Sequence, residues 1–123
     1  MDKLEKLFYK VEKNDEEWNK LNEGEKKLVR FWNFSRGEDR NITNNIIVDD
    51  IVWDKEMEDF VKALNDYEVD RMIFASTWSS AIELLMYLLD NGWTTAGTIV
   101  YRKEKIIGKD EYREIKGIKL IRK

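Results

Sequence analysis

The sequence predicts an α/β fold, with helices packed on a small three-stranded mixed sheet of β-α-β-β order and a helical segment before it. Apolar residues recur at helical spacing in the first half, and three extended runs interrupted by one helical run fill the second half. The 123 residues are 42% hydrophobic, enough for one domain with its own core. We expect a single domain over 1–123, comprising a helical segment (1–35), a helix (54–66) and the β-α-β-β unit (69–123).

The N-terminal segment begins with an apolar helix face formed by Leu4, Leu7, Phe8 and Val11. Asn14 precedes three acidic residues, which is typical of a new helix start. A further apolar stripe runs to Trp32 and is broken by Gly24. The pattern predicts either two helices or one long kinked helix, ending near residues 35–41.

The segment from Asn45 to Asp54 is β-branched and predicts a short strand or an ordered loop. Asp54 is a favoured N-cap residue for the helix that follows it. The apolar face of that helix repeats at helical spacing; its members are Met57, Phe60, Val61 and Leu64.

The C-terminal unit starts with a predicted strand at 69–76, followed by a helix at 80–91. We expect an apolar face formed by Ile82, Leu85, Met86 and Leu89, with Leu84 and Leu88 beside it. Gly92 fits the left-handed residue that ends many helices. Strands at 93–103 and 113–123 should form an antiparallel hairpin. If the strands at 69–76 and 93–103 are neighbours, their crossover should be parallel and right-handed.

Composition excludes most catalytic chemistry. The chain has no Cys and no His, which removes thiolate nucleophiles, imidazole bases and the usual transition-metal ligands. We therefore expect a non-enzymatic protein without a cofactor or a metal site. The N-terminus carries no apolar signal core, and no run is long enough to cross a bilayer. A cytoplasmic protein without membrane contact is the prediction.

Three motifs resemble a known family. Trp53-Asp54 precedes a helix, Phe74 to Ser79 fits an F-x-S-[ST]-[FW]-S turn, and Gly92 to Gly97 fits a G-x-x-x-x-G strand entry. Over roughly residues 30–121 the chain resembles a family of small uncharacterised proteins found in Firmicutes, their phages and their conjugative elements. The resemblance implies the α/β arrangement above and no assigned reaction. It also implies an accessory role of the mobile-element type.

The hydroxyl-rich turn is the first candidate site; it comprises Ser76, Thr77, Trp78, Ser79 and Ser80. It follows a strand and precedes a helix, where anions bind free N–H groups. It lacks the glycines of a phosphate-binding loop. Ser80-x-x-Glu83 also fits a capping box, which explains the hydroxyls without a ligand. Trp78 is either a core plug or an exposed partner anchor.

The acidic segment is the second candidate, and its candidate partner-binding residues are Asp49, Asp50, Asp54 and Glu58, together with Trp78. Residues 38–71 carry eleven acidic and four basic side chains. The alternatives are a solvated face, a magnesium site or a phosphate-mimicking surface. Residues 101–123 carry nine basic and four acidic side chains, as expected of a protected edge strand. The net charge of −3 and the absence of a recognition motif argue against nucleic acid as a partner.

Together these features predict an accessory protein that binds, and inhibits, a host defence or regulatory protein. The alternative is a small-ligand binder that sequesters a nucleotide or another anion at Ser76–Ser80. A carboxylate-based magnesium enzyme is a third hypothesis.

Overall fold

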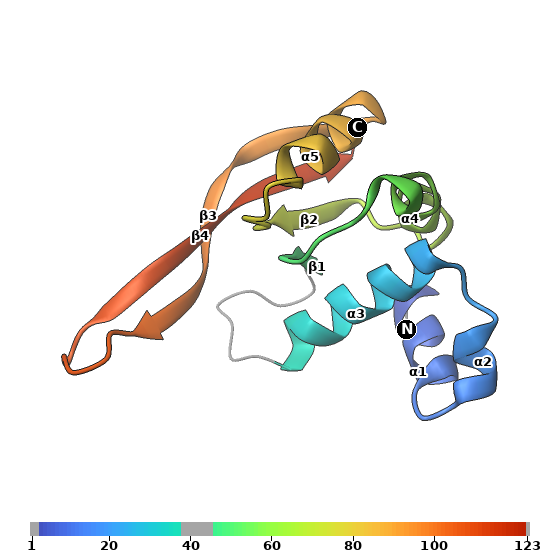
Figure 1. Cartoon of the computed structure of the whole chain (residues 1–123), viewed down its shortest axis with the longest axis horizontal. Coiled ribbons are helices and arrows are strands. Elements are labelled where there is room, and N and C mark those ends of the chain that lie inside the picture. Colours follow the sequence, from blue (N-terminus) through green and yellow to red (C-terminus); the bar gives the residue numbers. More distant parts are fainter. Residues whose placement is uncertain (1–2, 38–45, 123) are drawn as a thin grey trace.

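The computed structural model describes residues 3–37 and 46–122. Their helices are α1 (Lys3–Val11), α2 (Asp15–Asn19), α3 (Glu23–Gly37), α4 (Asp54–Asp66) and α5 (Ala81–Asp90). Their strands are β1 (Ile46–Val48), β2 (Arg71–Phe74), β3 (Trp93–Lys105) and β4 (Tyr112–Arg122). The α/β class is confirmed (Figure 1). None of these helices is long and apolar enough to cross a membrane.

The sheet formed by the described residues has four strands, in the order β1-β2-β4-β3, so the prediction of three strands is wrong. The additional strand, β1, lies in the segment for which the sequence predicted either a short strand or an ordered loop. It runs parallel to β2, with Ile46 opposite Met72 and Val48 opposite Phe74. Asn45 and Lys123, predicted at the ends of extended segments, lie outside the described residues.

The position of β4 also decides the crossovers. β4 lies between β2 and β3 and is antiparallel to both, so the C-terminal hairpin is confirmed. The two strands that the sequence considered as neighbours, β2 and β3, are therefore separated by β4. The neighbouring parallel pair is instead β1 and β2, which are joined through α4.

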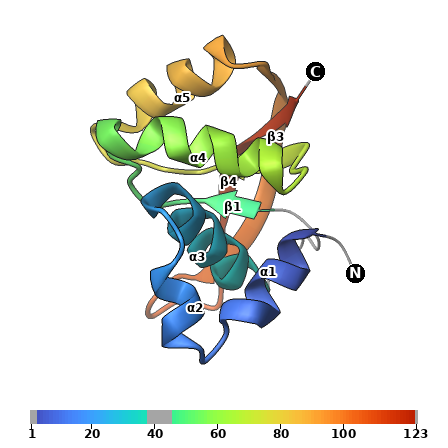
Figure 2. The ribbon, with the colours of Figure 1, turned by 90° about the vertical axis from the view of Figure 1, so that its right-hand side faces the viewer.

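Three helices, rather than one or two, form the described N-terminal segment (Figure 2). The α1 face predicted from the sequence is buried. The Asn14 side chain caps α2 by accepting a hydrogen bond from the Glu17 N–H. α3 begins at a reciprocal capping box, because Asn22 and Glu25 each accept a hydrogen bond from the other's backbone N–H.

The main core lies between the helices and one face of the sheet. Phe31 of α3 packs edge-to-face against Phe60 of α4, with ring centroids 5.7 Å apart. Trp32 turns instead toward Phe8 of α1, 4.6 Å between centroids. The adjacent aromatic residues Phe31 and Trp32 thus contact different helices. The backbone of α4 packs directly against Gly24 of α3.

The other face of the sheet carries a smaller cluster of Ile47, Ile73 and Tyr101. Tyr101 reaches it because β3 bends at two register shifts, between Thr95 and Thr98 and between Val100 and Arg102. Beyond this bend the β3–β4 hairpin projects from the body as an arm (Figure 1). At the end of the arm Ile107 is 99% exposed.

The buried face of α5 differs from the prediction. Leu84 and Leu88, predicted beside the apolar face, are the buried residues, and Leu85 packs partly against the core. The other members of the predicted face, Ile82, Met86 and Leu89, are exposed. The sequence misled because α5 is apolar on almost every side, so two different stripes satisfy helical periodicity. Contact with α4 and β3, which the spacing does not encode, selects between them.

Candidate functional site

Two loops meet beyond the carboxyl ends of β1 and β2. Because the two strands are parallel, residues 49–53 and residues 75–80 leave the sheet at the same edge. The Ala75 N–H donates to the Val48 carbonyl oxygen at 2.8 Å and holds the loops together at their origin. The acidic segment and the hydroxyl-rich turn, which the sequence presented as separate candidates, therefore adjoin each other.

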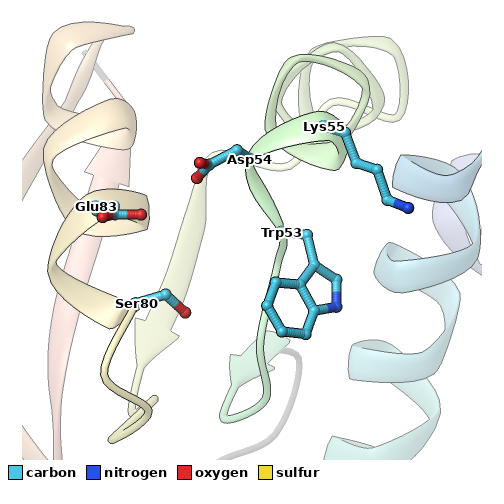
Figure 3. Close-up of a pocket in the computed structure, with 5 residues that line it drawn as sticks. All are labelled: Trp53, Asp54, Lys55, Ser80 and Glu83. Atoms are coloured by element: carbon cyan, nitrogen blue, oxygen red, sulfur yellow. The ribbon is translucent and has the colours of Figure 1, made fainter.

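Between these loops lies an open cavity of about 530 Å³. Its lining residues are Trp53, Asp54, Lys55, Ser80 and Glu83. Asp54 from the start of α4 and Ser80 and Glu83 from the start of α5 lie on facing sides of the opening (Figure 3). The Trp53 ring and the Lys55 side chain point away from α5. We call this set of residues the cleft.

A buried carboxylate fixes the α4 side of the cleft. Glu56 accepts a hydrogen bond from the Trp53 N–H at 2.9 Å, which makes Trp53, not Asp54, the N-cap of α4. The Lys27 ammonium group of α3 donates to the Ile51 carbonyl oxygen at 2.7 Å. With its backbone held at both points, the loop presents the Trp53 side chain at 53% exposure.

The α5 side of the cleft lacks the predicted capping box. Ser80 is the N-cap, yet its side chain makes no capping hydrogen bond. Its backbone has φ −88° and ψ 3°, away from the extended geometry that aims an N-cap side chain at the following N–H groups. The Ser80 hydroxyl and the Glu83 carboxylate consequently line the cavity instead of satisfying each other's backbone.

Trp78 is 56% exposed, so its interpretation as a core plug is wrong. Thr77 and Ser79 are also exposed and Ser76 is half-buried. Of the five hydroxyl-turn candidates, Ser80 is the one that lines the cleft.

The acidic candidates are spread over two elements. Asp49 is half-buried, and Asp50 accepts a hydrogen bond from the Ile51 N–H at 2.7 Å. Asp54 lines the cleft and Glu58 lies exposed one turn further along α4. Within the described residues, no group of three or more carboxylates is placed to hold a metal ion.

Residues 27–122 match the model of a family described as a domain of unknown function, DUF7698. The chain belongs to the DUF7698 family. The match covers every strand, α4, α5 and most of α3, so the whole cleft lies inside the DUF7698 region. No curated protein and no solved structure matches the chain.

Sequence reasoning missed three cleft residues of this DUF7698 chain as site residues: Trp53, Lys55 and Glu83. A signal was present for Trp53, because the Trp53-Asp54 step was among the motifs that carried the family resemblance. Glu83 was assigned to the capping box, which the structure does not form. Nothing in the local sequence marks Lys55.

Proposed function

We propose that this DUF7698 protein acts by binding a partner protein at the cleft and at the adjoining Trp78. The observation that carries the proposal is the pair of exposed tryptophans, Trp53 and Trp78, on two adjoining loops. Tryptophan is the residue type most enriched among binding hot spots, where its large apolar surface becomes buried on association.

The charge of the cleft indicates which partner side chains it suits. Asp54 and Glu83 are exposed and have no ion pair with any other described residue. A Lys or Arg side chain of a partner would form charge-assisted hydrogen bonds with these carboxylates. A basic side chain beside the Trp53 ring would also form a cation–π pair. The cleft therefore suits a basic surface of the partner.

The finer proposal is an accessory protein of phage or mobile-element type that blocks a host defence or regulatory protein in the cytoplasm. The family resemblance supports the genetic setting. The lack of His and Cys supports binding rather than catalysis. An acidic surface with exposed tryptophans can occupy a groove that normally holds phosphate groups.

Site-specific photo-crosslinking in the organism that encodes the protein tests this proposal. A photo-reactive amino acid at position 53 or 78 should capture the same protein partner. The matched control is position 112, because Tyr112 is also exposed but lies on the arm. Capture should disappear in the double variant Asp54→Lys/Glu83→Lys. No adduct from either position, or equal capture from position 112, would contradict the proposal.

A small anionic ligand at Ser76–Ser80 is the second candidate function. The absence of a side-chain cap on α5 favours it, since no serine hydroxyl accepts a hydrogen bond from the first N–H groups of the helix. Two of these groups already have backbone acceptors, because the Ala81 and Glu83 N–H groups donate to the Trp78 and Ser80 carbonyl oxygens. The carboxylates of Asp54 and Glu83 oppose it, because they would repel an anion in the cleft. Native mass spectrometry of freshly purified protein separates the two. A stoichiometric ligand that is lost in Ser76→Ala/Ser79→Ala would favour the anion binder.

A further inference from the structure

We infer that the exposed face of α5 is a docking surface for a basic amphipathic helix of the partner. This inference rests on the proposed function and names the class of partner segment. It extends the binding surface from the cleft along the whole of α5.

An apolar stripe runs along the outer side of α5. Ile82 and Met86, 58% and 52% exposed, are followed by Leu89 at 41%. Ile82, Met86 and Leu89 recur at the spacing of one helix face, and the exposed Trp78 lies in the turn just before α5. We call the four residues Trp78, Ile82, Met86 and Leu89 the stripe. No contact within the described residues buries it, whereas Leu84 and Leu88 already satisfy the core.

Carboxylates flank the stripe on one side. Glu83 and Asp90 project from α5 beside it, both exposed. Across the cleft, Asp54 and Glu58 are exposed on α4. None of the four forms an ion pair with another described residue. Lys55 and Lys62 of α4 are the basic residues of these two helices, and Lys62 pairs with Asp66.

This combination selects a helix with apolar anchors at i, i+3/i+4 and i+7, flanked by Lys or Arg. The stripe from Ile82 to Leu89 is about 10 Å long at the rise of an α-helix, enough for two turns of a partner helix. Met86 lies at its centre and adapts to different anchors, since methionine is unbranched and flexible.

A second copy of this chain fits the surface poorly. α5 carries Glu83 and Asp90 but no basic residue, so a pair of packed α5 helices would bring like charges together without a counter-charge on either helix. β-Strand addition at the outer edge of β3 is also disfavoured by its two register shifts.

An 18-residue helical peptide of Leu and Lys, with its leucines on one face, is the test probe. A scrambled peptide of the same composition controls for non-specific attraction between unlike charges. The structure predicts that the full chain binds the amphipathic peptide about tenfold more tightly than the scrambled one. Ile82→Gln/Met86→Gln should remove that preference. The control Ile107→Gln, at a more exposed aliphatic position on the arm, should retain it.

Three outcomes would overturn the inference. The first is equal affinity for the two peptides, and the second is an unchanged preference in Ile82→Gln/Met86→Gln. The third is a dimer of the free protein, measured by sedimentation, that this variant dissociates. The second outcome has a special case, in which Asp54→Asn/Glu83→Gln weakens peptide binding although Ile82→Gln/Met86→Gln does not. That result would contradict docking on α5 and leave the cleft proposal intact. Peptide binding at the stripe without crosslinks from position 53 would contradict the cleft proposal and leave docking on α5 intact.

Discussion

At the residue scale, two similar sequence patterns have different structures. Asn22-x-x-Glu25 forms a reciprocal capping box at the start of α3, whereas Ser80-x-x-Glu83 at the start of α5 does not. Only the second box was predicted from the sequence. The residue types of a capping motif determine which hydrogen bonds its side chains can form. The backbone dihedral angles of the N-cap residue, set here by the loop from β2, decide whether they form.

The difference predicts the effect of alanine at each position. Asn22→Ala should lower the free energy of unfolding by about 1 kcal/mol, because the Glu25 N–H loses its acceptor. Ser80→Ala should change it by less than about 0.5 kcal/mol, because no capping bond is lost. Urea denaturation of both variants measures this. A larger loss for Ser80→Ala than for Asn22→Ala would show that the Ser80 hydroxyl caps α5 in solution.

Tyr67 predicts a dependence of stability on alkaline pH. Its hydroxyl donates to Glu25 at 2.8 Å, and burial, followed by this bond to a carboxylate, raises its pKa to about 12 from 10.0. A raised pKa stabilises the fold below pH 10, and this contribution is lost as the pH rises toward 12. Tyr67→Phe should be less stable at pH 8 by about 1 kcal/mol. The difference from wild type should shrink between pH 10 and 12; a constant difference in urea denaturation across that range would contradict it.

At the element scale, the α3–α4 contact depends on Gly24. A Cβ atom at this position would lie 2.2 Å from the Asp59 carbonyl carbon and 2.3 Å from the Phe60 nitrogen. Both are backbone atoms, so no side chain can rotate out of the way. In the sequence, Gly24 interrupts an apolar stripe. The close approach to α4 explains why the position holds glycine.

Gly24→Ala should therefore lower the free energy of unfolding by about 2 kcal/mol or more, because α3 must move away from α4. Gly108→Ala is the control, because it also replaces a glycine but at a position that does not contact α3 or α4. Gly108 lies on the arm with open space around its Cβ position, although its φ of +79° costs some strain. Thermal unfolding of the two variants measures the contrast. A smaller loss for Gly24→Ala than for Gly108→Ala would contradict the close packing of α3 on α4.

The elements themselves were more predictable than their contacts. The helix expected at 54–66 coincides with α4, and Gly92 has the expected positive φ after α5. Periodicity and turn chemistry are local, so the sequence encodes them over a few residues. The buried side of α5 and the exposure of Trp53 and Trp78 depend on residues far along the chain. For that reason the cleft could be predicted only as two separate segments.

At the scale of the whole molecule, the body and the arm differ in how they are held. β4 pairs with β2 through Ile118 to Ile121, whereas the outer part of the hairpin has β3 and β4 as each other's sole strand partners among the described residues. Glu104 bridges Arg102 and Arg113 there, and these are exposed or half-buried pairs of small energetic value.

Replacing residues 104–111 with a two-residue turn should therefore leave the body folded. Tyr101 and Ile115, which belong to the smaller cluster, are kept in this variant. We expect the midpoint of urea unfolding to remain within experimental error of the wild-type value, while backbone amides of the remaining outer hairpin exchange faster than those of β2. A cooperative loss of near-ultraviolet circular dichroism would instead show that the arm stabilises the body.

The strand order was the least predictable feature at this scale. The sequence indicated the hairpin of β3 and β4, because a short turn joins them. It did not indicate that β4 inserts beside β2, since that pairing joins residues about fifty positions apart in the chain. Gly117 marks the insertion, because a Cβ there would lie 2.5 Å from the Ile73 Cγ2 atom. This glycine is interpretable only after the pairing is known.

The central place of β4 has a consequence for the nascent polypeptide. A ribosome makes β4 last among the four strands, yet β4 joins the β1–β2 pair to β3. Until it emerges, β2 keeps one edge unpaired, and Leu120 is missing from the core. A polypeptide that ends before residue 112 would thus expose apolar surface and become a substrate for chaperones and proteases. A product that ends before residue 112 therefore lacks the strand that connects β2 to β3.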